Sequence, residues 1–427
     1  MSTVILGGGI IGTSIAYHLS KSQPETEIHI IEQSSQLFSS ASGYAGGFLA
    51  RDWFAPSLAS LGALSFDLHH RLSSEKDGAK KWGFMKGTAF NLDSVPNQRR
   101  GGAGSDDWIH DGTSRAETAA AIDALSAEWP AWLTKQDGRV IERISEGETV
   151  AQVDPLRLSR FLMDEALLHG VKLHHPAKAT EIIKDESGTI IGVKVLDLRS
   201  KNEFILPCTN LVLSAGAWTP QVLHELFPSN ELSFNISPLA GYSLVVRSPR
   251  YTLDHERVIN NGRSHALFTE HPASCGFSPE IFTREGGEIY IAGLNPDLSL
   301  PSCVADVRQL WDPTEMQKLK DVAVRLMGQL PGDSFGSSDH IRNTDDLEIL
   351  REGLCFRPVG DNEIPTIGRI RDSSLGDGVR ASGGGGVYIA SGHGPWGISL
   401  SLGTGKVMAD LIQGELVSAD VSQLAVK

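Results

Sequence analysis

The chain has 427 residues, with 38 Lys and Arg against 52 Asp and Glu, which gives a formal net charge of −14. Apolar residues make up 40% of the chain and charged residues 21%, a globular composition that argues against disordered and fibrous classes. The acidic balance and the absence of a Lys/Arg cluster argue against nucleic-acid binding. No run of about 18 apolar residues is present, so the sequence predicts no membrane span.

Glycine is the unusual component, because the chain has 45 glycines, or about a tenth of its residues, against a typical ~7%. The four cysteines lie far apart without a CxxC pair, which argues against a disulfide framework or a structural zinc site. Such cysteine usage fits a reducing compartment. With no leader pattern at Met1, we expect a cytoplasmic protein.

The hydrophobic pattern predicts strands and helices in an alternating order from the N-terminus. A short strand, a helix and a second strand at residues 3–31 form a βαβ unit, and residues 51–144 look irregular. The remaining predicted elements are a helix at 155–169, a meander at 181–183, 190–198 and 204–206, strands at 211–213, 243–246, 288–292 and 387–391, and helices at 314–330 and 401–412.

The first βαβ unit carries a dinucleotide-binding fingerprint, Gly7-x-Gly9-x-x-Gly12. The first glycine permits a tight turn, the second lets the backbone approach a pyrophosphate, and the third lets helix and strand pack closely. Glu32 follows 20 residues after Gly12, at the end of the second strand, where a carboxylate can bind ribose hydroxyls. The order and spacing of the glycines, the helix and Glu32 predict a bound dinucleotide, but they do not separate NAD from FAD.

Further glycine-rich motifs follow in a characteristic order. They are the segment Ser39–Gly47, the strand end Leu211–Gly216 with Ala217-Trp218-Thr219-Pro220, Arg357-Pro358 with Pro365-x-Ile367-Gly368, Ser391–Gly397, and Gly403-Thr404-Gly405-Lys406 at an expected helix start. Together these motifs resemble the D-amino-acid oxidase superfamily of FAD-dependent oxidoreductases, which includes glycine oxidase and sarcosine oxidase. The order of the motifs is most similar to that of uncharacterised fungal-type members, and the resemblance covers the whole chain.

The resemblance implies an α/β fold with a Rossmann-like, glutathione-reductase-type FAD-binding domain and a mixed-sheet α+β substrate domain. The FAD-binding domain would be discontinuous, formed by residues 1–50, 145–235 and 345–427. The substrate domain would be formed by residues 51–144 and 236–344.

The resemblance also implies which segments contact FAD. The fingerprint would hold the ADP half, the serine-rich segment would follow the pyrophosphate and ribityl chain, and residues 177–179 would meet the adenine. The Gly-His segment and the expected helix N-terminus after it would approach the flavin ring. The implied contacts are Gly7, Gly9, Ile10, Ile11, Gly12, Glu32, Gln33, Ser40, Ser42, Gly43, Ala45, Gly46, Gly47, Ala179, Ala215, Gly216, Trp218, Cys355, Arg357, Gly392, His393, Gly394, Trp396, Gly397 and Thr404.

Cys355 has two interpretations. In sarcosine-oxidase-like members, a cysteine at the matching place carries FAD through a thioether. This chain lacks the Thr-Pro-Asp that usually follows the arginine and has Val359-Gly360-Asp361-Asn362 instead. The alternative is a small buried apolar residue, as free cysteine usually is.

The sequence offers two arginines as candidates for the residue that anchors the substrate. Related amine oxidases hold a substrate carboxylate with a basic side chain, in some members just after the Gly-His pair, where this chain has Pro395 and Trp396. Arg51 and Arg284 are the alternative anchors, although each could equally form a surface ion pair. Trp396 and Tyr242 suggest a more apolar or aromatic pocket.

The histidines show no metal-ligand spacing, and the pairs His69-His70 and His174-His175 are expected at the surface, so no metal site is predicted. The resemblance implies oxidation of a C–N bond in a small amine or amino acid by hydride transfer to flavin N5. O2 is the expected acceptor, with H2O2 as product. A dehydrogenase with another acceptor and a non-catalytic FAD-binding interaction protein remain alternatives, and the sequence leaves the substrate and the oligomeric state open.

Overall fold

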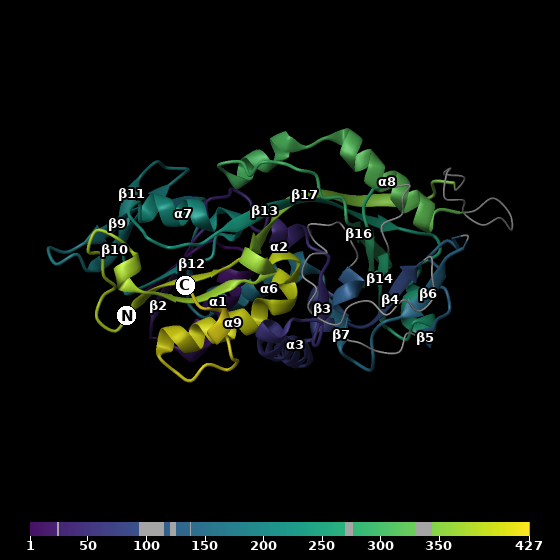
Figure 1. Cartoon of the computed structure of the whole chain (residues 1–427), viewed down its shortest axis with the longest axis horizontal. Coiled ribbons are helices and arrows are strands. Elements are labelled where there is room, and N and C mark those ends of the chain that lie inside the picture. The colour runs from purple at the N-terminus through teal and green to yellow at the C-terminus, as the bar shows by residue number, and fades with distance from the viewer. Residues whose placement is uncertain are drawn as a thin grey trace.

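Two large β-sheets organise the chain (Figure 1). The structure is a computed structural model, and it describes residues 1–23, 25–93, 115–119, 125–136, 138–269, 276–329 and 344–426. Within these residues one sheet has the strand order β18-β19-β12-β1-β2-β8, and the other follows β17-β13-β16-β15-β14-β4-β6-β5. This mixed α/β arrangement confirms the predicted fold class.

The first sheet is mainly parallel. The strands β1, β2, β8, β12 and β19 pair in parallel, and β18 runs antiparallel to β19 at the edge. Because parallel strands end at the same edge of a sheet, the segments that follow them converge there. The strand bounds are β1 (Ser2–Leu6), β2 (Glu27–Ile31), β8 (Lys172–His174), β12 (Asn210–Leu213), β18 (Thr366–Ile370) and β19 (Gly386–Ser391).

Both faces of this sheet are covered, because successive side chains of β1 point to opposite faces. Ile5 packs into a core with helices α1 and α9, whereas Val4 and Leu6 pack towards the three-stranded sheet β9–β11 and α7. The elements are α1 (Ile10–Ser22), α2 (Ala41–Tyr44), α3 (Pro56–Lys76), α4 (Gly78–Trp82), α6 (Pro155–Leu168), α7 (Thr219–Leu226), α9 (Gly397–Gln413), β9 (Ala177–Lys184), β10 (Ile190–Asp197) and β11 (Glu203–Pro207).

The second sheet is mixed and packs against α8 (Pro313–Met327). Its longest ladder joins β13 and β17, from Ile236 opposite Gly360 to Arg247 opposite Glu348. In Figure 1 these two strands run from the region of the first sheet into the second. The strands are β3 (Phe48–Ala50), β4 (Met85–Asp93), β5 (Leu125–Ser126), β6 (Val140–Arg143), β7 (Val150–Gln152), β13 (Ile236–Arg247), β14 (Ser264–Thr269), β15 (Glu280–Arg284), β16 (Glu288–Ala292) and β17 (Glu348–Gly360).

The structure differs from several of the expectations. Residues 56–76, expected to be irregular, form α3, which packs against α9 beside the first sheet. Strand β17 belongs to the second sheet, although residues 345–427 were assigned to the FAD-binding domain. Helix α9 begins at Gly397 rather than near residue 401. None of the helices in the described residues is long and apolar enough to cross a membrane.

Candidate active site

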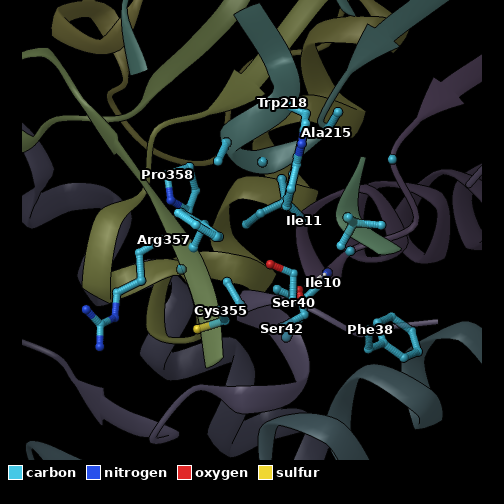
Figure 2. Close-up of a pocket in the computed structure, with 18 of the residues that line it drawn as sticks. Ile10, Ile11, Phe38, Ser40, Ser42, Ala215, Trp218, Cys355, Arg357 and Pro358 are labelled. Carbon is cyan, nitrogen blue, oxygen red and sulfur yellow. Dashed lines mark hydrogen bonds between the residues drawn. The ribbon is translucent and has the colours of Figure 1, made fainter. Parts of the chain in front are cut away.

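A cleft opens where the parallel strands end. Its walls include the residues that follow β1, β2, β12 and β19, together with the faces of β13 and β17. Figure 2 shows Cys355, Arg357 and Pro358 of β17 on one side and Ile11, Ser40 and Ser42 on the other, with the Arg357 side chain pointing away from the serines. The topology therefore brings the glycine motifs at the two ends of the chain to one place.

The fingerprint glycines have separate structural reasons. Gly7 has φ +111°, and a Cβ there would lie 2.4 Å from the Ser214 carbonyl oxygen. A Cβ on Gly12 would lie 2.1 Å from the Gly7 carbonyl oxygen, so Gly12 serves the packing of α1 on β1 and does not line the cleft. Gly9 lines the cleft, and a Cβ there would meet only the Ser42 hydroxyl, at 3.2 Å. The turn thus leaves its backbone open to a ligand.

Glu32 is fixed by the backbone around it. Its carboxylate accepts hydrogen bonds from the Gly8 N–H at 2.8 Å and the Ser34 N–H at 2.7 Å. Burial raises the pKa of the Glu32 carboxyl, and these backbone donors act in the opposite direction. The carboxylate lines the cleft beside Gln33, so it is held ready to accept from ribose hydroxyls.

The N-terminal ends of two helices face the cleft. Ile10 and Ile11 at the start of α1 line it, as do Gly397 and Ile398 at the start of α9. The Ser42 hydroxyl accepts a hydrogen bond from the Ile10 N–H at 2.9 Å, which joins the serine-rich segment to α1. Since a helix N-terminus carries partial positive charge, both ends favour an anionic ligand such as a pyrophosphate or a reduced flavin.

His393 lies just before the start of α9 and is buried, with 2% of its surface exposed. Burial lowers its pKa to about 3, so the imidazole is neutral at ordinary pH. Its Nε2 lies 3.0 Å from the Thr404 hydroxyl, whereas Nδ1 has no hydrogen-bond partner among the described residues. His393 lines the cleft, so its unpaired Nδ1 is available to a bound ligand.

These features fit FAD, because the glycine turn, the fixed carboxylate, the two helix N-termini and the buried imidazole all border one cleft. Of the expected contacts, the cleft is lined by Gly7, Gly9, Ile10, Ile11, Glu32, Gln33, Ser40, Ser42, Ala45, Gly46, Ala179, Ala215, Gly216, Trp218, Cys355, Arg357, His393, Gly394 and Gly397. It is not lined by Gly12, Gly43, Gly47, Gly392, Thr404 or Trp396.

The expected helix start at residues 403–406 is wrong, because these residues lie inside α9. A Cβ on Gly403 would lie 2.8 Å from the Ser65 Cβ of α3, and one on Gly405 would lie 2.3 Å from the Ser14 hydroxyl of α1. These glycines therefore let three helices approach closely. Thr404 acts at the cleft only through His393.

The structure adds Arg115 to the cleft, a residue that no sequence motif marks. Its guanidinium lines the cleft, forms a 2.8 Å ion pair with Glu280, and lies 4.9 Å from the ring centroid of Trp396. Both partners of the ion pair are largely buried, with 9% and 14% of their side-chain surface exposed. Arg115 belongs to no motif, and Glu280 is 165 residues away, so no local signal could have joined them.

Arg357 lines the same end of the cleft from β17. Its guanidinium donates to the Asn295 side-chain oxygen at 2.7 Å and lies over Gly241, where a Cβ would approach it to 2.5 Å. Cys355, two residues earlier on β17, also lines the cleft and is buried. Burial raises the pKa of the Cys355 thiol, while the charge of Arg357 lowers it.

The expected substrate residues lie elsewhere. Arg51 is exposed and pairs with Asp67 at 3.2 Å, so it is a surface residue. Tyr242 is fully buried and accepts from the Asp312 N–H, because alternation along β13 turns it away from the cleft. Trp396 does not line the cleft but stacks behind Arg115. Arg284 lies behind Tyr290, with its guanidinium 4.6 Å from that ring centroid.

The adjacent histidines also differ from expectation. His69 is only 1% exposed, and its Nε2 donates to the Ile398 carbonyl oxygen at 3.1 Å. His174 is partly buried and lies 3.0 Å from the His29 ring nitrogen. Within the parts of the chain that the structure describes, no group of three or more His, Cys, Asp or Glu side chains could hold a metal ion.

Comparison with known proteins gives relatives over the whole length. The putative oxidoreductase C1F5.03c of Schizosaccharomyces pombe is 27% identical over 443 residues, covering 99% of this chain and 96% of that protein. Glycine oxidase from Geobacillus kaustophilus has the same fold, with a TM-score of 0.69 and 19% identity, covering 100% of this chain and 98% of that one. The structure of iminodiacetate oxidase from Chelativorans sp. BNC1 is also similar, with a TM-score of 0.64 and 16% identity, covering 99% of this chain and 98% of that one.

A family model described as FAD dependent oxidoreductase matches residues 2–411. That match includes both glycine-rich ends of the chain and all strands that border the cleft. The protein therefore belongs to the DAO family of FAD-dependent oxidoreductases.

Proposed function

We propose that the protein oxidises a C–N bond of a small amino acid or amine, with FAD bound in the cleft and O2 as the electron acceptor. The observation that carries the proposal is the pair of arginines, Arg115 and Arg357, that line the cleft together with Cys355 and His393. Guanidinium groups bind carboxylates through paired charge-assisted hydrogen bonds. The names of the structural neighbours, glycine oxidase and iminodiacetate oxidase, support a substrate of this class.

When bound, FAD supplies a two-electron acceptor next to the substrate carbon. The protein's own part is to hold the substrate. Arg357, with a neutral partner in Asn295, offers its charge to the substrate carboxylate. Arg115 is kept in place by Glu280 and by the Trp396 ring. This anchoring orients the carbon that reacts, and orientation alone can lower a barrier by several kcal/mol.

The walls around the anchor exclude water. Tyr290 lines the cleft, is 3% exposed, and donates its hydroxyl to the Tyr44 carbonyl oxygen at 3.1 Å. Phe268 is fully buried, with the Arg115 guanidinium 6.0 Å from its ring centroid. Electrostatic interactions strengthen in such an environment, so one or two cationic groups suffice to select a carboxylate.

Anaerobic titration of the flavin-loaded protein tests the proposal. The flavin absorbance is followed against a panel of secondary amines and D- and L-amino acids. We expect at least one member of the panel to bleach the flavin, and air to restore the colour with release of H2O2. A panel that leaves the flavin oxidised would contradict the enzymatic proposal, and restoration only by an artificial dye would replace O2 with another acceptor.

Substitution of the anchor provides a sharper readout. Arg357→Gln should raise KM for a carboxylated substrate about a hundredfold, because the loss of a charged partner costs roughly 3 kcal/mol. Arg247→Gln is a matched control, since Arg247 pairs with Glu348 at the exposed far end of the same ladder. An equal change in KM in both variants would rule out Arg357 as the anchor.

A further inference from the structure

Arg284 at the end of β15 is a buried cation that the proposed chemistry does not use. Only 2% of its surface is exposed, and it does not line the cleft. Among the described residues its Nε and Nη1 atoms have no hydrogen-bond partner. Burial of a guanidinium with unsatisfied donors costs several kcal/mol, so its presence needs a physical reason.

The contacts that Arg284 does make all lead to one loop. Its Nη2 donates to the Ala45 carbonyl oxygen at 2.8 Å and to the Gly46 carbonyl oxygen at 2.7 Å. The hydroxyl of Tyr290, whose ring stacks on Arg284, donates to the preceding carbonyl of Tyr44. Three successive carbonyl groups are thus drawn to one side of the loop.

The other side of the loop faces the cleft. Tyr44, Ala45 and Gly46 all line it. In a planar trans peptide the N–H points opposite to the carbonyl. The carbonyls of Ala45 and Gly46 point to Arg284, so the N–H groups of the two following residues, Gly46 and Gly47, point away from Arg284. The Ala45 N–H is already used, since it donates to the Ala41 carbonyl.

The charged groups around Arg284 do not cancel its effect on the loop. Asp154 and Glu288 favour its charged form and Arg351 opposes it, but none of the three forms an ion pair with it. Burial lowers the pKa of Arg284, yet a guanidinium remains protonated in proteins. A fixed positive charge therefore lies directly behind a segment that borders the cofactor.

We propose that Arg284 is a positioning residue that fixes the 45–46 peptide group with its N–H donor towards the flavin, and so favours the reduced cofactor. Both the oriented donor and the buried charge stabilise added electron density, and neither needs to reorganise when the flavin is reduced. The role requires a bound flavin but no particular substrate.

The test compares Arg284→Met and Arg284→Lys with the unchanged flavin-loaded protein. The midpoint potential of the bound flavin is measured by dye equilibration, and the stability of the flavin-free protein is measured separately by thermal unfolding. We expect Arg284→Met to weaken binding of reduced flavin relative to oxidised flavin about tenfold, which is a fall of about 30 mV for a two-electron couple. Arg284→Lys keeps the charge but not the planar donor. We expect it to weaken binding of reduced flavin relative to oxidised flavin about threefold.

Arg247→Met serves as the matched control, because it removes an exposed arginine from the same sheet. It should leave the potential unchanged. If the potential of Arg284→Met equals that of the control while its unfolding temperature falls, Arg284 is only structural and the proposal is overturned. If the methionine variant does not fold, the lysine variant decides, and an unchanged potential there overturns the proposal. If no amine in the panel bleaches the flavin but Arg284→Met shifts its midpoint potential, the proposed function is contradicted. The positioning role of Arg284 is then still supported.

Discussion

Acid should destabilise the protein through His69, which lies between α3 and the start of α9. Its Nε2 donates to the Ile398 carbonyl oxygen, and Ile398 lines the cleft. Burial lowers the pKa of His69 to about 4, against about 6.5 in an unfolded chain. Between these values the unfolded chain binds the proton and the folded chain does not. The stability from this group is therefore present above pH 6.5 and is lost as the pH falls towards 4.

The size of the effect follows from these two pKa values. At pH 5 the linkage relation gives a loss of about 2 kcal/mol relative to pH 7.5. His69→Gln should remove this loss, because the glutamine amide can still donate to the Ile398 carbonyl but does not titrate. His18, His265 and His393 are also buried with lowered pKa values, so the variant keeps part of the acid sensitivity.

Urea unfolding of the flavin-loaded protein at pH 7.5 and pH 5.0 measures the effect, with flavin release and tryptophan emission as probes. The difference between the two pH values should be about 2 kcal/mol smaller for His69→Gln than for the unchanged protein. His224→Gln, at an exposed position of α7, is the control for removal of an imidazole from a helix. Parallel pH profiles for His69→Gln and the unchanged protein would refute the reasoning.

Three further outcomes are expected. Gly7→Ala should weaken FAD binding about a hundredfold, since the φ of +111° and the 2.4 Å approach to Ser214 cost about 3 kcal/mol, and flavin titration of the refolded apoprotein checks this. Gly241→Ala should push the Arg357 guanidinium aside, raising KM for a carboxylated substrate about tenfold with little change in kcat, and steady-state kinetics would show the split. Acid precipitation should leave all the flavin in the supernatant, because burial keeps the Cys355 thiol protonated, and a yellow pellet that turns colourless in Cys355→Ser would contradict this.

The hydrophobic pattern and the turn residues predicted those helices and strands that form from a single continuous segment. The apolar strand, the glycine turn and the helix at residues 2–22 lie where the pattern placed them, and β16 matches its predicted bounds. Helix α3 carries apolar residues at helical spacing, including Leu58, Leu61 and Leu72, and begins with Pro56, so its signal was present but was obscured by the irregular segment around it.

The site could be predicted only where one segment supplies the contact. Glu32 and the Gly7 turn belong to a single βαβ unit, and their spacing defines their geometry. The ion pair of Arg115 with Glu280 depends on how distant strands are ordered, which no local pattern encodes. Gly405 shows a second limit, because a glycine that permits close helix packing has the same sequence appearance as one that permits a turn.

The order of strands in the first sheet has a consequence for protein synthesis. Strand β1 pairs with β2 and β12, and β12 pairs with β19, so β1 is flanked on both sides only after residue 213 has been made, and the sheet is extended to β19 only after residue 389. Helix α9, which packs on α1, comes later still. At about 5–20 residues per second, the first strand waits many seconds on the ribosome with its apolar side chains uncovered. Cofactor capture therefore requires β19 and α9 to have been made, and shortening the C-terminus before residue 397 should yield an aggregating apoprotein rather than a smaller flavoprotein.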